Sequence, residues 1–423
     1  MKLIQKSALF TLFHHDITYQ NNTFKFDTKY LYEIAQEQPK YNIEDIVDKF
    51  YCIITEHLNG YKNSEVSITL TGGMDSRIIL AALLKAGVKP NCITFGNSQA
   101  IDVVLAKNIA EHFGLSFHNA CPNSPIKEWY YKWIVDTIIK DNGNAHLHRA
   151  HRNAAIAEHT EIYSPKVLFT GHMGGESIKG YIYNNYIASS FLEIINGRKK
   201  DILETARGIL FDYFIKTENV DFNVLKKSLE NLTWLKHDRE TNEFFFLYDL
   251  VAKIHHAQDI RLYQNYVPKV VPVFLEEQYL ELLFASPYNF LSKKNTLLNR
   301  VKYPEFYCRI IQKLYPPLLD FTFANGFSPK EYLRGFWRYL PYKLYRDTQK
   351  KKYPPTFSYG KWYVDFVKKH VQNMSPEIWE IYDKIRYMKA LENNYHRSDE
   401  GYWHKFSNPI FFDLVRKYIN VKI

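Results

Sequence analysis

Apolar residues along the first 170 positions follow two different periods. Positions 41–60 repeat apolar residues at helical spacing and end in Asn59-Gly60, a pair typical of a helix C-terminus. Short runs rich in β-branched residues, typical of buried strands, occupy Glu65–Leu70, Asn91–Phe95, Leu115–His118 and Lys166–Thr170. Helical periodicity fills the stretches 77–86, 102–113, 128–139 and 148–159. This alternation predicts βαβ units and a parallel sheet.

The chain from about position 185 onward has a mainly helical pattern. Apolar spacing predicts helices over Phe191–Asn196, Leu225–Leu235, Phe244–Ile254 and Tyr279–Phe284. Beyond position 300 the pattern stays helical and aromatic, interrupted by Pro316-Pro317 and Pro354-Pro355. We therefore expect an α/β protein with about five parallel strands. Its expected parts are a short N-terminal segment 1–42, a sheet domain 43–300 with a helical insertion at about 185–265, and an α-helical region 301–423.

The composition narrows the class of protein. With 46% hydrophobic and 24% charged residues, the 423-residue chain is typical of a soluble globular protein. Its four cysteines, Cys52, Cys92, Cys121 and Cys308, lie far apart. This spacing argues against a zinc ribbon, an iron–sulfur site or a thioredoxin motif, and it fits a reducing compartment. No apolar run is long enough to span a membrane and no signal-peptide pattern is present, so we expect a cytoplasmic protein.

Most of the net charge of +10 lies in one stretch, because positions 330–370 hold eleven Lys and Arg against three Asp and Glu. Within it, Lys350, Lys351 and Lys352 precede several aromatic residues, a mixture that can bind nucleic acid or anionic lipid. A lysine run is more often a solvated face, and that is the interpretation we adopt. An RNA-modifying, adenylylating enzyme stays as an alternative.

The most informative segment is Ser67–Leu84, a buried strand that runs into Gly72-Gly73 and then into a helix. Glycines allow backbone N–H groups to face an anion, and the N-terminus of the helix adds its dipole. Ser76 can donate to a phosphate oxygen, and an acid beside phosphate, Asp75, implies a bridging Mg²⁺. The spacing matches neither a Walker A loop nor a dinucleotide-binding fingerprint, so a plain strand–helix turn is the other interpretation.

The heptapeptide Thr71-Gly72-Gly73-Met74-Asp75-Ser76-Arg77 resembles the Ser-Gly-Gly-x-Asp-Ser pyrophosphate loop (PP-loop) of the N-type ATP pyrophosphatases. With the helix after it, the loop looks most like the synthetase domain of the asparagine synthetase family. Four further blocks, in the same order as in that family, are similar to it: Ile93–Gly96, Lys166–Tyr181, Pro272–Pro287 and Gly326–Pro329. The resemblance implies an adenine nucleotide α-hydrolase-like fold with a parallel sheet.

The resemblance also implies a reaction. ATP and Mg²⁺ would bind at the carboxyl edge of the sheet, where a substrate carboxylate would attack the α-phosphate to form an acyl-adenylate. Ammonia or an amine would then form an amide, on a small molecule, a glycan or a peptide. The residues implied to contact ATP are Leu70, Thr71, Gly72, Gly73, Asp75, Ser76, Arg77, Thr94, Phe95 and Gly171. The implied metal ligands are Asp75 and Glu176, and the implied catalytic residues are His172 and Glu176.

The chain departs from the family pattern at four places. Lys2 stands where the glutaminase nucleophile would be, and the N-terminal segment is too short for that domain. Nitrogen would therefore come from free ammonia, a substrate amine or a separate partner protein. Gly175 replaces the Asp of the acidic loop, so that Glu176 remains, and His172 stands where relatives have Glu or Tyr. Ala324 replaces a Lys that stabilises charge in the transition state.

These departures lead to two hypotheses and one alternative. We expect His172 to be the general base, because an imidazole with an ordinary pKa near ~6.5 accepts a proton at neutral pH. We expect Glu176 to take over the metal role. The alternative is a nucleotide-binding protein without catalysis that acts through a partner, unless Arg300, Lys302 or Lys330 replaces the missing lysine.

The stretch Asn144–Asn153 is rich in basic residues. His146, His148 and His151 have the character of metal ligands, but no cysteine or fourth ligand is near, which argues against zinc. Arg149 and Arg152 have two interpretations: they meet phosphates or a substrate carboxylate, or they lie on a solvated helix face.

Overall fold

We describe the fold from a computed structural model of the chain. The described residues are 3–13, 23–120, 128–180, 201–231, 237–291, 297–324, 326–334, 353–354, 356, 360–393 and 400–419. The expected helix over Phe191–Asn196 and the lysine run at 350–352 lie outside them.

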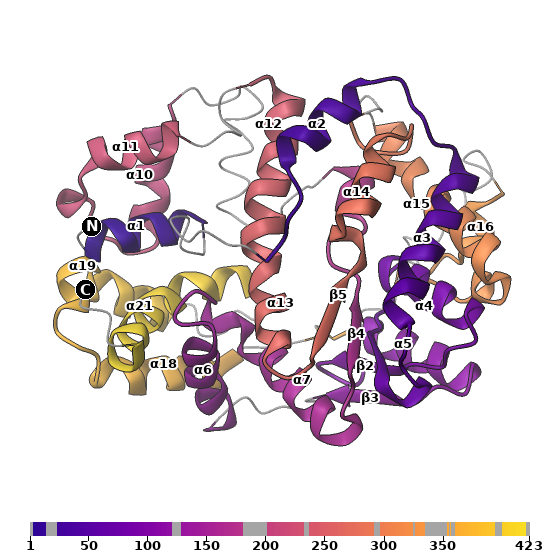
Figure 1. The fold of residues 1–423 in the computed structure, drawn as a ribbon. Helices are drawn as coiled ribbons and strands as arrows, with labels where there is room; N and C mark the ends of the chain where they lie inside the picture. Colours follow the sequence, from indigo (N-terminus) through magenta and orange to yellow (C-terminus); the bar gives the residue numbers. More distant parts are fainter. Residues whose placement is uncertain are drawn as a thin grey trace.

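A five-stranded parallel sheet forms the centre of the protein (Figure 1). Its strands are β1 (Val66–Thr69), β2 (Asn91–Phe95), β3 (Phe117–Ala120), β4 (Val167–Thr170) and β5 (Lys269–Pro272). They lie in the order β3-β2-β1-β4-β5, and Ser67 of β1 pairs with Asn91 on one side and Leu168 on the other. The strand order reverses between β1 and β4, and in open parallel sheets ligands bind beyond the carboxyl ends at such a point. The expected α/β sheet is therefore confirmed.

Alternate residues of the strands enter two different hydrophobic layers. On β4, Val167 and Phe169 belong to the main core, whereas Leu168 belongs to a smaller cluster with Ala155 of α7 and Leu262 of α13. Because successive strand residues point to opposite faces, both faces are covered by helices. Figure 1 shows α7 and α13 on one side of the sheet and α3, α4 and α5 on the other.

The helices up to the acidic loop are α1 (Leu3–Phe13), α2 (Thr28–Gln36), α3 (Ile43–Leu58), α4 (Asp75–Lys85), α5 (Ile101–His112), α6 (Glu128–Lys140), α7 (Ala150–Tyr163) and α8 (Glu176–Lys179). The helices after it are α10 (Ile202–Asp212), α11 (Phe222–Glu230), α12 (Arg239–Phe245), α13 (Ala257–Gln264), α14 (Glu277–Phe284), α15 (Leu297–Leu314), α16 (Pro329–Tyr332), α18 (Gly360–Gln372), α19 (Ile378–Ile381), α20 (Lys384–Asn393) and α21 (Glu400–Ile419). Short 3₁₀ turns are η1 (Asn63–Glu65), η2 (Leu147–Arg149), η3 (Thr217–Asn219), η6 (Val273–Leu275) and η7 (Pro316–Asp320). No helix of the described part is both long and apolar enough to cross a bilayer.

A π-helical segment, η5 (Phe246–His256), joins α12 to α13. Figure 1 shows α12 and α13 at the two ends of one continuous rod beside β5. The expected helix Phe244–Ile254 is therefore only the middle of a longer element. Wider π turns rotate the residues that follow them, and they occur often at functional sites.

The third strand begins later than the sequence pattern indicates. We expected it at Leu115–His118, but β3 is Phe117–Ala120. Leu115 instead completes the end of α5, because its N–H donates to the Ala110 carbonyl (2.9 Å) while Gly114 takes a positive φ of 60°. This left-handed C-terminal turn uses the apolar residue that resembled the start of a strand. The expected helix at Leu225–Leu235 corresponds to α11, which begins earlier and ends at Glu230, and positions 232–235 lie outside the described residues.

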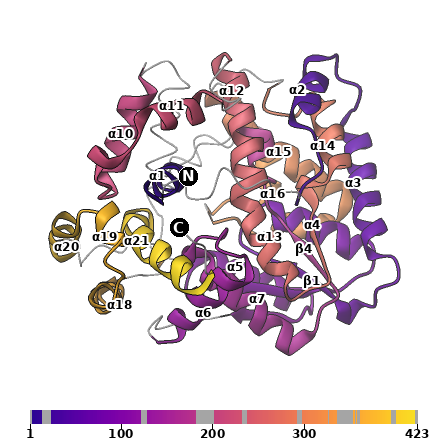
Figure 2. The same cartoon turned by 60° about the vertical axis from the view of Figure 1, so that its left-hand side comes forward.

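The N-terminal segment is part of the main fold. Phe10 of α1 stacks on Phe411 of α21, with ring centroids 4.4 Å apart. Gln5 donates to the Asp221 carbonyl (2.7 Å) and accepts from its N–H (3.2 Å). Figures 1 and 2 both show α1 between α10 and α21. One hydrophobic cluster contains residues from all three expected parts of the chain.

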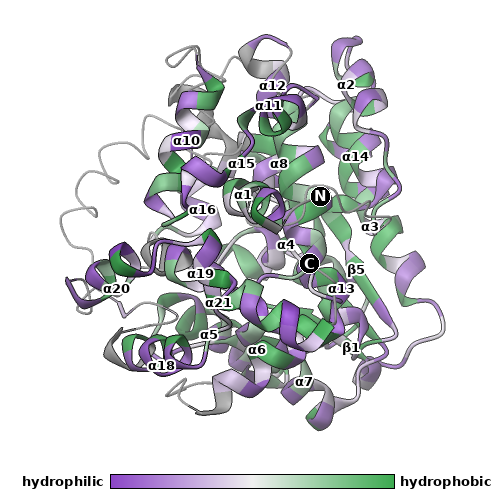
Figure 3. Ribbon diagram, turned by 90° about the vertical axis from the view of Figure 1, so that its left-hand side faces the viewer, coloured by the Kyte–Doolittle hydropathy of each residue, from purple (hydrophilic) through white to green (hydrophobic). Residues whose placement is uncertain are grey.

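The outer C-terminal helices are amphipathic. On α18, Val364, Val367 and Val371 are buried at a spacing of three and four residues. Figure 3 shows hydrophilic and hydrophobic residues on different sides of α18 and α20. Within the described residues, this pattern confirms the helical character that the sequence indicated for the region beyond 300.

Candidate functional site

The segment Thr71–Arg77, which we call the PP-loop after the motif that it resembles, connects β1 to the first turn of α4. Its hydroxyls order the loop from within: the Thr71 N–H donates to Ser76 Oγ (3.1 Å) and the Gly73 N–H donates to Thr71 Oγ1 (3.1 Å). The N-terminal N–H groups of an α-helix carry a partial positive charge. The loop therefore combines a helix dipole with the hydroxyls and glycines that the sequence analysis selected.

A second glycine-rich loop, Gly171–Gly175 after β4, packs directly on the PP-loop. A Cβ added to Gly174 would lie 2.6 Å from Asp75 Cγ, and one added to Gly171 would lie 3.1 Å from the Ser76 nitrogen. The Tyr307 hydroxyl donates to the Gly174 carbonyl and so fixes this loop from the side of α15. The two loops are therefore in contact with each other at the carboxyl ends of β1 and β4.

Replacing Gly174 with alanine should therefore disturb the site. The new Cβ would collide with the Asp75 side chain near its base, so we expect a loss of about 1–3 kcal/mol in unfolding free energy. Gly208 is the matched control, because it lies inside α10 and an added Cβ would meet nothing within 4 Å. Gly208→Ala should stabilise the protein by about 0.5–1 kcal/mol. Urea denaturation of both variants measures the contrast, and equal effects would contradict the close contact at Gly174.

Carboxylates surround the PP-loop on two sides. Asp102 of α5 approaches Gly72, where its Oδ1 would lie 3.0 Å from an added Cβ. Burial raises the pKa of Asp102, and the Gly72 backbone N–H partly offsets this effect. Burial is the main cause that raises the pKa of both Tyr279 and Tyr248, and the charges of Asp75 on Tyr279 and of Glu176 on Tyr248 add to it. Carboxylate oxygens are the ligands that Mg²⁺ prefers, so Asp75 and Glu176 have side chains of the right chemistry for such an ion.

Arg77 has a different place from the other loop residues. Its side chain is fully buried and donates to the carbonyls of Phe321 (2.5 Å), Thr322 (3.0 Å) and Gly72 (3.3 Å). Its guanidinium also lies 4.3 Å from the centre of the Phe323 ring. Burial lowers the pKa of Arg77 to about 9. Arg77 therefore holds the 321–323 segment against the PP-loop.

Leu70 and Thr94, two of the residues implied to contact ATP, form hydrogen bonds within the protein. The Leu70 N–H donates to the Ile93 carbonyl (2.9 Å), and the Thr94 hydroxyl donates to the Leu70 carbonyl. Just beyond β2, the Asn97 N–H donates to the Thr356 carbonyl (2.8 Å). The carboxyl end of β2 thus carries a contact from the C-terminal region.

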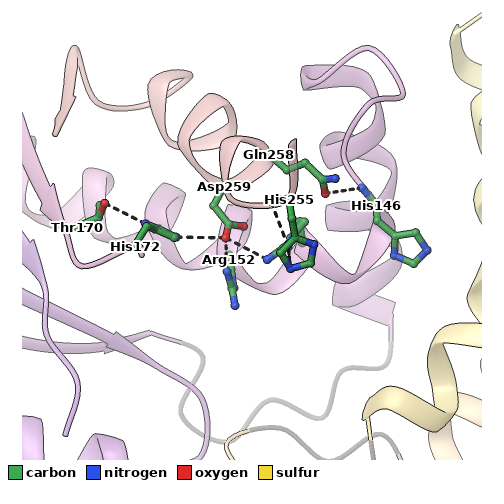
Figure 4. Close-up of polar contacts among 8 residues, drawn as sticks. His146, Arg152, Thr170, His172, His255, Gln258 and Asp259 are labelled. Atoms are coloured by element: carbon green, nitrogen blue, oxygen red, sulfur yellow. Dashed lines mark hydrogen bonds and ion pairs between the residues drawn. The ribbon is translucent and has the colours of Figure 1, made fainter. Parts of the chain in front are cut away.

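A buried cluster of charged and imidazole side chains lies beside the two loops (Figure 4). His172 places Nδ1 2.9 Å from Thr170 Oγ1 and Nε2 3.3 Å from Asp259 Oδ2. Arg149 donates to the same Asp259 oxygen (3.0 Å), and Arg152 donates to it as well. We call Arg149, Arg152, His172 and Asp259 the Asp259 cluster.

Four elements bring the Asp259 cluster together. Arg149 ends the 3₁₀ turn η2, and Arg152 lies in the first turn of α7. His172 follows β4, whereas Asp259 lies in the first turn of α13, directly after the π-helical segment. Sequence analysis missed Asp259, because it lies in the stretch assigned to a helical insertion and belongs to no motif.

The electrostatics of the cluster favour a charged Asp259. Burial pushes the pKa of Asp259 upward, but Arg149, Arg152 and His172 outweigh it and hold that pKa well below its ordinary value. Burial lowers the pKa of His151 and of His256 well below the ordinary 6.5. Both imidazoles are therefore neutral at pH 7.

The histidine stretch is largely buried by other parts of the fold. His146, His148 and His151 are 2%, 3% and 7% exposed, and Arg149 is 7% exposed. His146 Nε2 lies 3.1 Å from Asn408 Oδ1, and its ring stacks on His148 at 4.7 Å. The solvated-face interpretation is therefore wrong for Arg149, and Arg152, which is half-buried, pairs with the buried Asp259. Sequence could not show this, because α21 and α13 cover the stretch from far along the chain.

Comparison with known proteins does not assign the chain. No protein-family model matches it, and no curated protein matches its sequence. The geometry of the two loops and the Asp259 cluster therefore has to carry the functional conclusion.

Proposed function

We propose that this protein is an ATP-dependent ligase that activates a substrate carboxylate as an acyl-adenylate and joins it to ammonia or an amine. The observation that carries the proposal is the direct contact between two glycine-rich loops at the switch point of a parallel sheet. We also propose that the sheet belongs to a PP-loop domain. The sequence resemblance to the asparagine synthetase family supports this assignment.

In this proposal the PP-loop binds the phosphates of ATP. Its backbone N–H groups and the Ser76 hydroxyl would donate to phosphate oxygens, with the dipole of α4 behind them. Asp75 and Glu176 would hold Mg²⁺, which neutralises phosphate charge when bound. Arg77 keeps the 321–323 segment in place without reaching the solvent.

The role of His172 follows from its two ring nitrogens. Nε2 faces the Asp259 carboxylate, so this nitrogen carries the proton when Asp259 is charged. Nδ1 then accepts from the Thr170 hydroxyl, which is buried. This arrangement supports His172 as a member of the Asp259 cluster more directly than as a general base, which stays our hypothesis from the sequence.

A nucleotide-binding protein without catalysis is the second candidate, and one observation favours it. Ala324 is exposed, and Lys330, one possible replacement for the missing lysine, pairs with Asp320 at the surface (3.1 Å). The side chains of Arg300 and Lys302 lie outside the described residues. Pyrophosphate exchange into ATP in the presence of candidate carboxylates separates a ligase from a binder.

Asp75→Asn tests the nucleotide site. Because the amide cannot neutralise Mg²⁺, we expect Mg²⁺-dependent ATP binding to weaken about tenfold or more, which is about 1.4 kcal/mol. Isothermal titration with ATP, with and without Mg²⁺, measures the effect. Glu111→Gln is the control, since this exposed α5 residue pairs with Lys107 (3.6 Å) and the substitution should leave binding unchanged. Unchanged Mg²⁺-dependent affinity in Asp75→Asn would refute the site.

A further inference from the structure

Helix α5 packs against the first glycine of the PP-loop. A Cβ added to Gly72 would lie 2.8 Å from Leu105 Cδ1 and 3.0 Å from Asp102 Oδ1. Asp102 and Leu105 are three positions apart in α5, so they lie on one face of the helix. Glycine allows this close approach because it has no side chain. The half-buried carboxylate of Asp102 is therefore held beside the loop that carries the proposed phosphate site.

The Asp102 carboxylate is not neutralised within the described part of the chain. No lysine, arginine or histidine of the described residues forms an ion pair with it. Burial raises the pKa of Asp102, and the Gly72 N–H acts in the opposite direction. Arg77, the basic residue of the PP-loop, donates instead to the Gly72 carbonyl (3.3 Å) and to the 321–323 segment. A carboxylate in this position favours a cation nearby and disfavours a second anion.

The charge of Asp102 acts on whatever the PP-loop binds. The proposed ligand, the phosphate chain of ATP, is an anion, and like charges repel strongly across a partly buried site because solvent and salt screen them little. Magnesium held against the phosphates by Asp75 would offset that repulsion. The loop thus offers hydrogen-bond donors to a phosphate chain, while the neighbouring carboxylate disfavours a chain that arrives without its metal.

We propose that Asp102 is a specificity-determining residue, which makes the PP-loop accept the magnesium complex of a nucleotide's phosphate chain and discriminate against the metal-free form. Asp102 acts through repulsion, so the role requires no bond between its carboxylate and the ion. The inference rests on the proposed function only as far as nucleotide binding. It therefore applies to a ligase and to a nucleotide-binding protein without catalysis alike.

Two substitutions separate this role from a purely structural one. Asp102→Asn keeps the shape of the side chain and an oxygen that accepts from the Gly72 N–H, but it removes the charge. We expect it to bind metal-free ATP and metal-free pyrophosphate about tenfold more tightly, whereas the magnesium complexes should gain less. Asp102→Ala also removes the contact with the loop, which weakens both forms alike, so the ratio of the two affinities should still fall. A residue that only positions the loop would leave this ratio unchanged in both variants.

The test is isothermal titration calorimetry of the purified full chain with ATP and with pyrophosphate, each in excess Mg²⁺ and in EDTA. The quantity compared is the ratio of the affinities with and without Mg²⁺. Glu111→Gln is the matched control, because it removes one negative charge from an exposed residue of the same helix, which pairs with Lys107 (3.6 Å). Glu111 lies about 13 Å from Asp102 along the helix axis, so the ratio should equal that of the unaltered protein.

Two results would overturn the inference and leave the proposed function standing. One is an unchanged affinity ratio in Asp102→Asn, or in Asp102→Ala if the first variant does not fold. The other is an equal fall of the ratio in Glu111→Gln, because net charge alone would then explain the effect. Absence of ATP binding in the presence of Mg²⁺ would refute the proposed function and this inference with it. Failed pyrophosphate exchange with intact ATP binding would remove the ligase and keep the role of Asp102.

Discussion

Replacing Arg77 with alanine is expected to lower the free energy of unfolding by about 4 kcal/mol. The change removes the Arg77 donor from three carbonyls, those of Gly72, Phe321 and Thr322, of which the Gly72 carbonyl is buried. It also removes the contact with the Phe323 ring and opens a cavity. Hydrogen bonds to a charged group contribute about 1.5–3 kcal/mol each, and truncation of a large buried side chain costs a similar amount.

The control for this prediction is Arg309→Ala. Arg309 forms an exposed pair with Glu305 within one helix (2.6 Å), with 52% of the arginine side chain exposed. Such pairs contribute about 0.5 kcal/mol or less. Chemical denaturation of both variants should show a difference of several kcal/mol. Similar losses would mean that Arg77 does not hold the 321–323 segment.

Acid should destabilise the protein strongly at pH values where most proteins are near their optimum. Burial, together with His118, lowers the pKa of His159 to about 3 from the ordinary 6.5. Between these values the unfolded chain binds a proton that the folded chain does not. The contribution of neutral His159 to the free energy of unfolding is therefore fully present above about pH 7 and is lost as the pH falls. Between pH 7 and pH 5 the loss from His159 alone is about 2 kcal/mol. His151 and His256 act in the same direction.

His159→Gln isolates this contribution. His159 Nε2 lies 2.8 Å from Ser67 Oγ inside the sheet layer, and glutamine can keep that hydrogen bond without taking up a proton. Below pH 6, the free energy of unfolding of the variant should depend on pH less steeply than that of the unaltered protein, by about 1.4 kcal/mol per pH unit. Denaturation midpoints at several pH values measure the slope, with the exposed His237→Gln as control. A slope equal to that of the unaltered protein would show that His159 is not the group responsible.

Sequence patterns predicted the parts of the site that lie next to one another in the chain. The strand, the glycine pair and the helix that begins at Asp75 are local features, and each left a signature. The sequence motif did not reveal that Arg77 binds the 321–323 segment. A basic residue one position after Ser76 resembles a phosphate ligand until the 321–323 carbonyls are seen to surround it.

By itself, the sequence determined the alternation of strands and helices, the parallel sheet and the glycine-rich turn between β1 and α4. Strand and helix periods and glycine turns are set by neighbouring residues, which explains this success. The tertiary structure decided the rest. It buried the histidine stretch, moved the start of β3 and brought Asp259 to Arg149 and His172 across about ninety or more positions. Such contacts depend on how helices pack, and packing leaves no local signature in a single sequence.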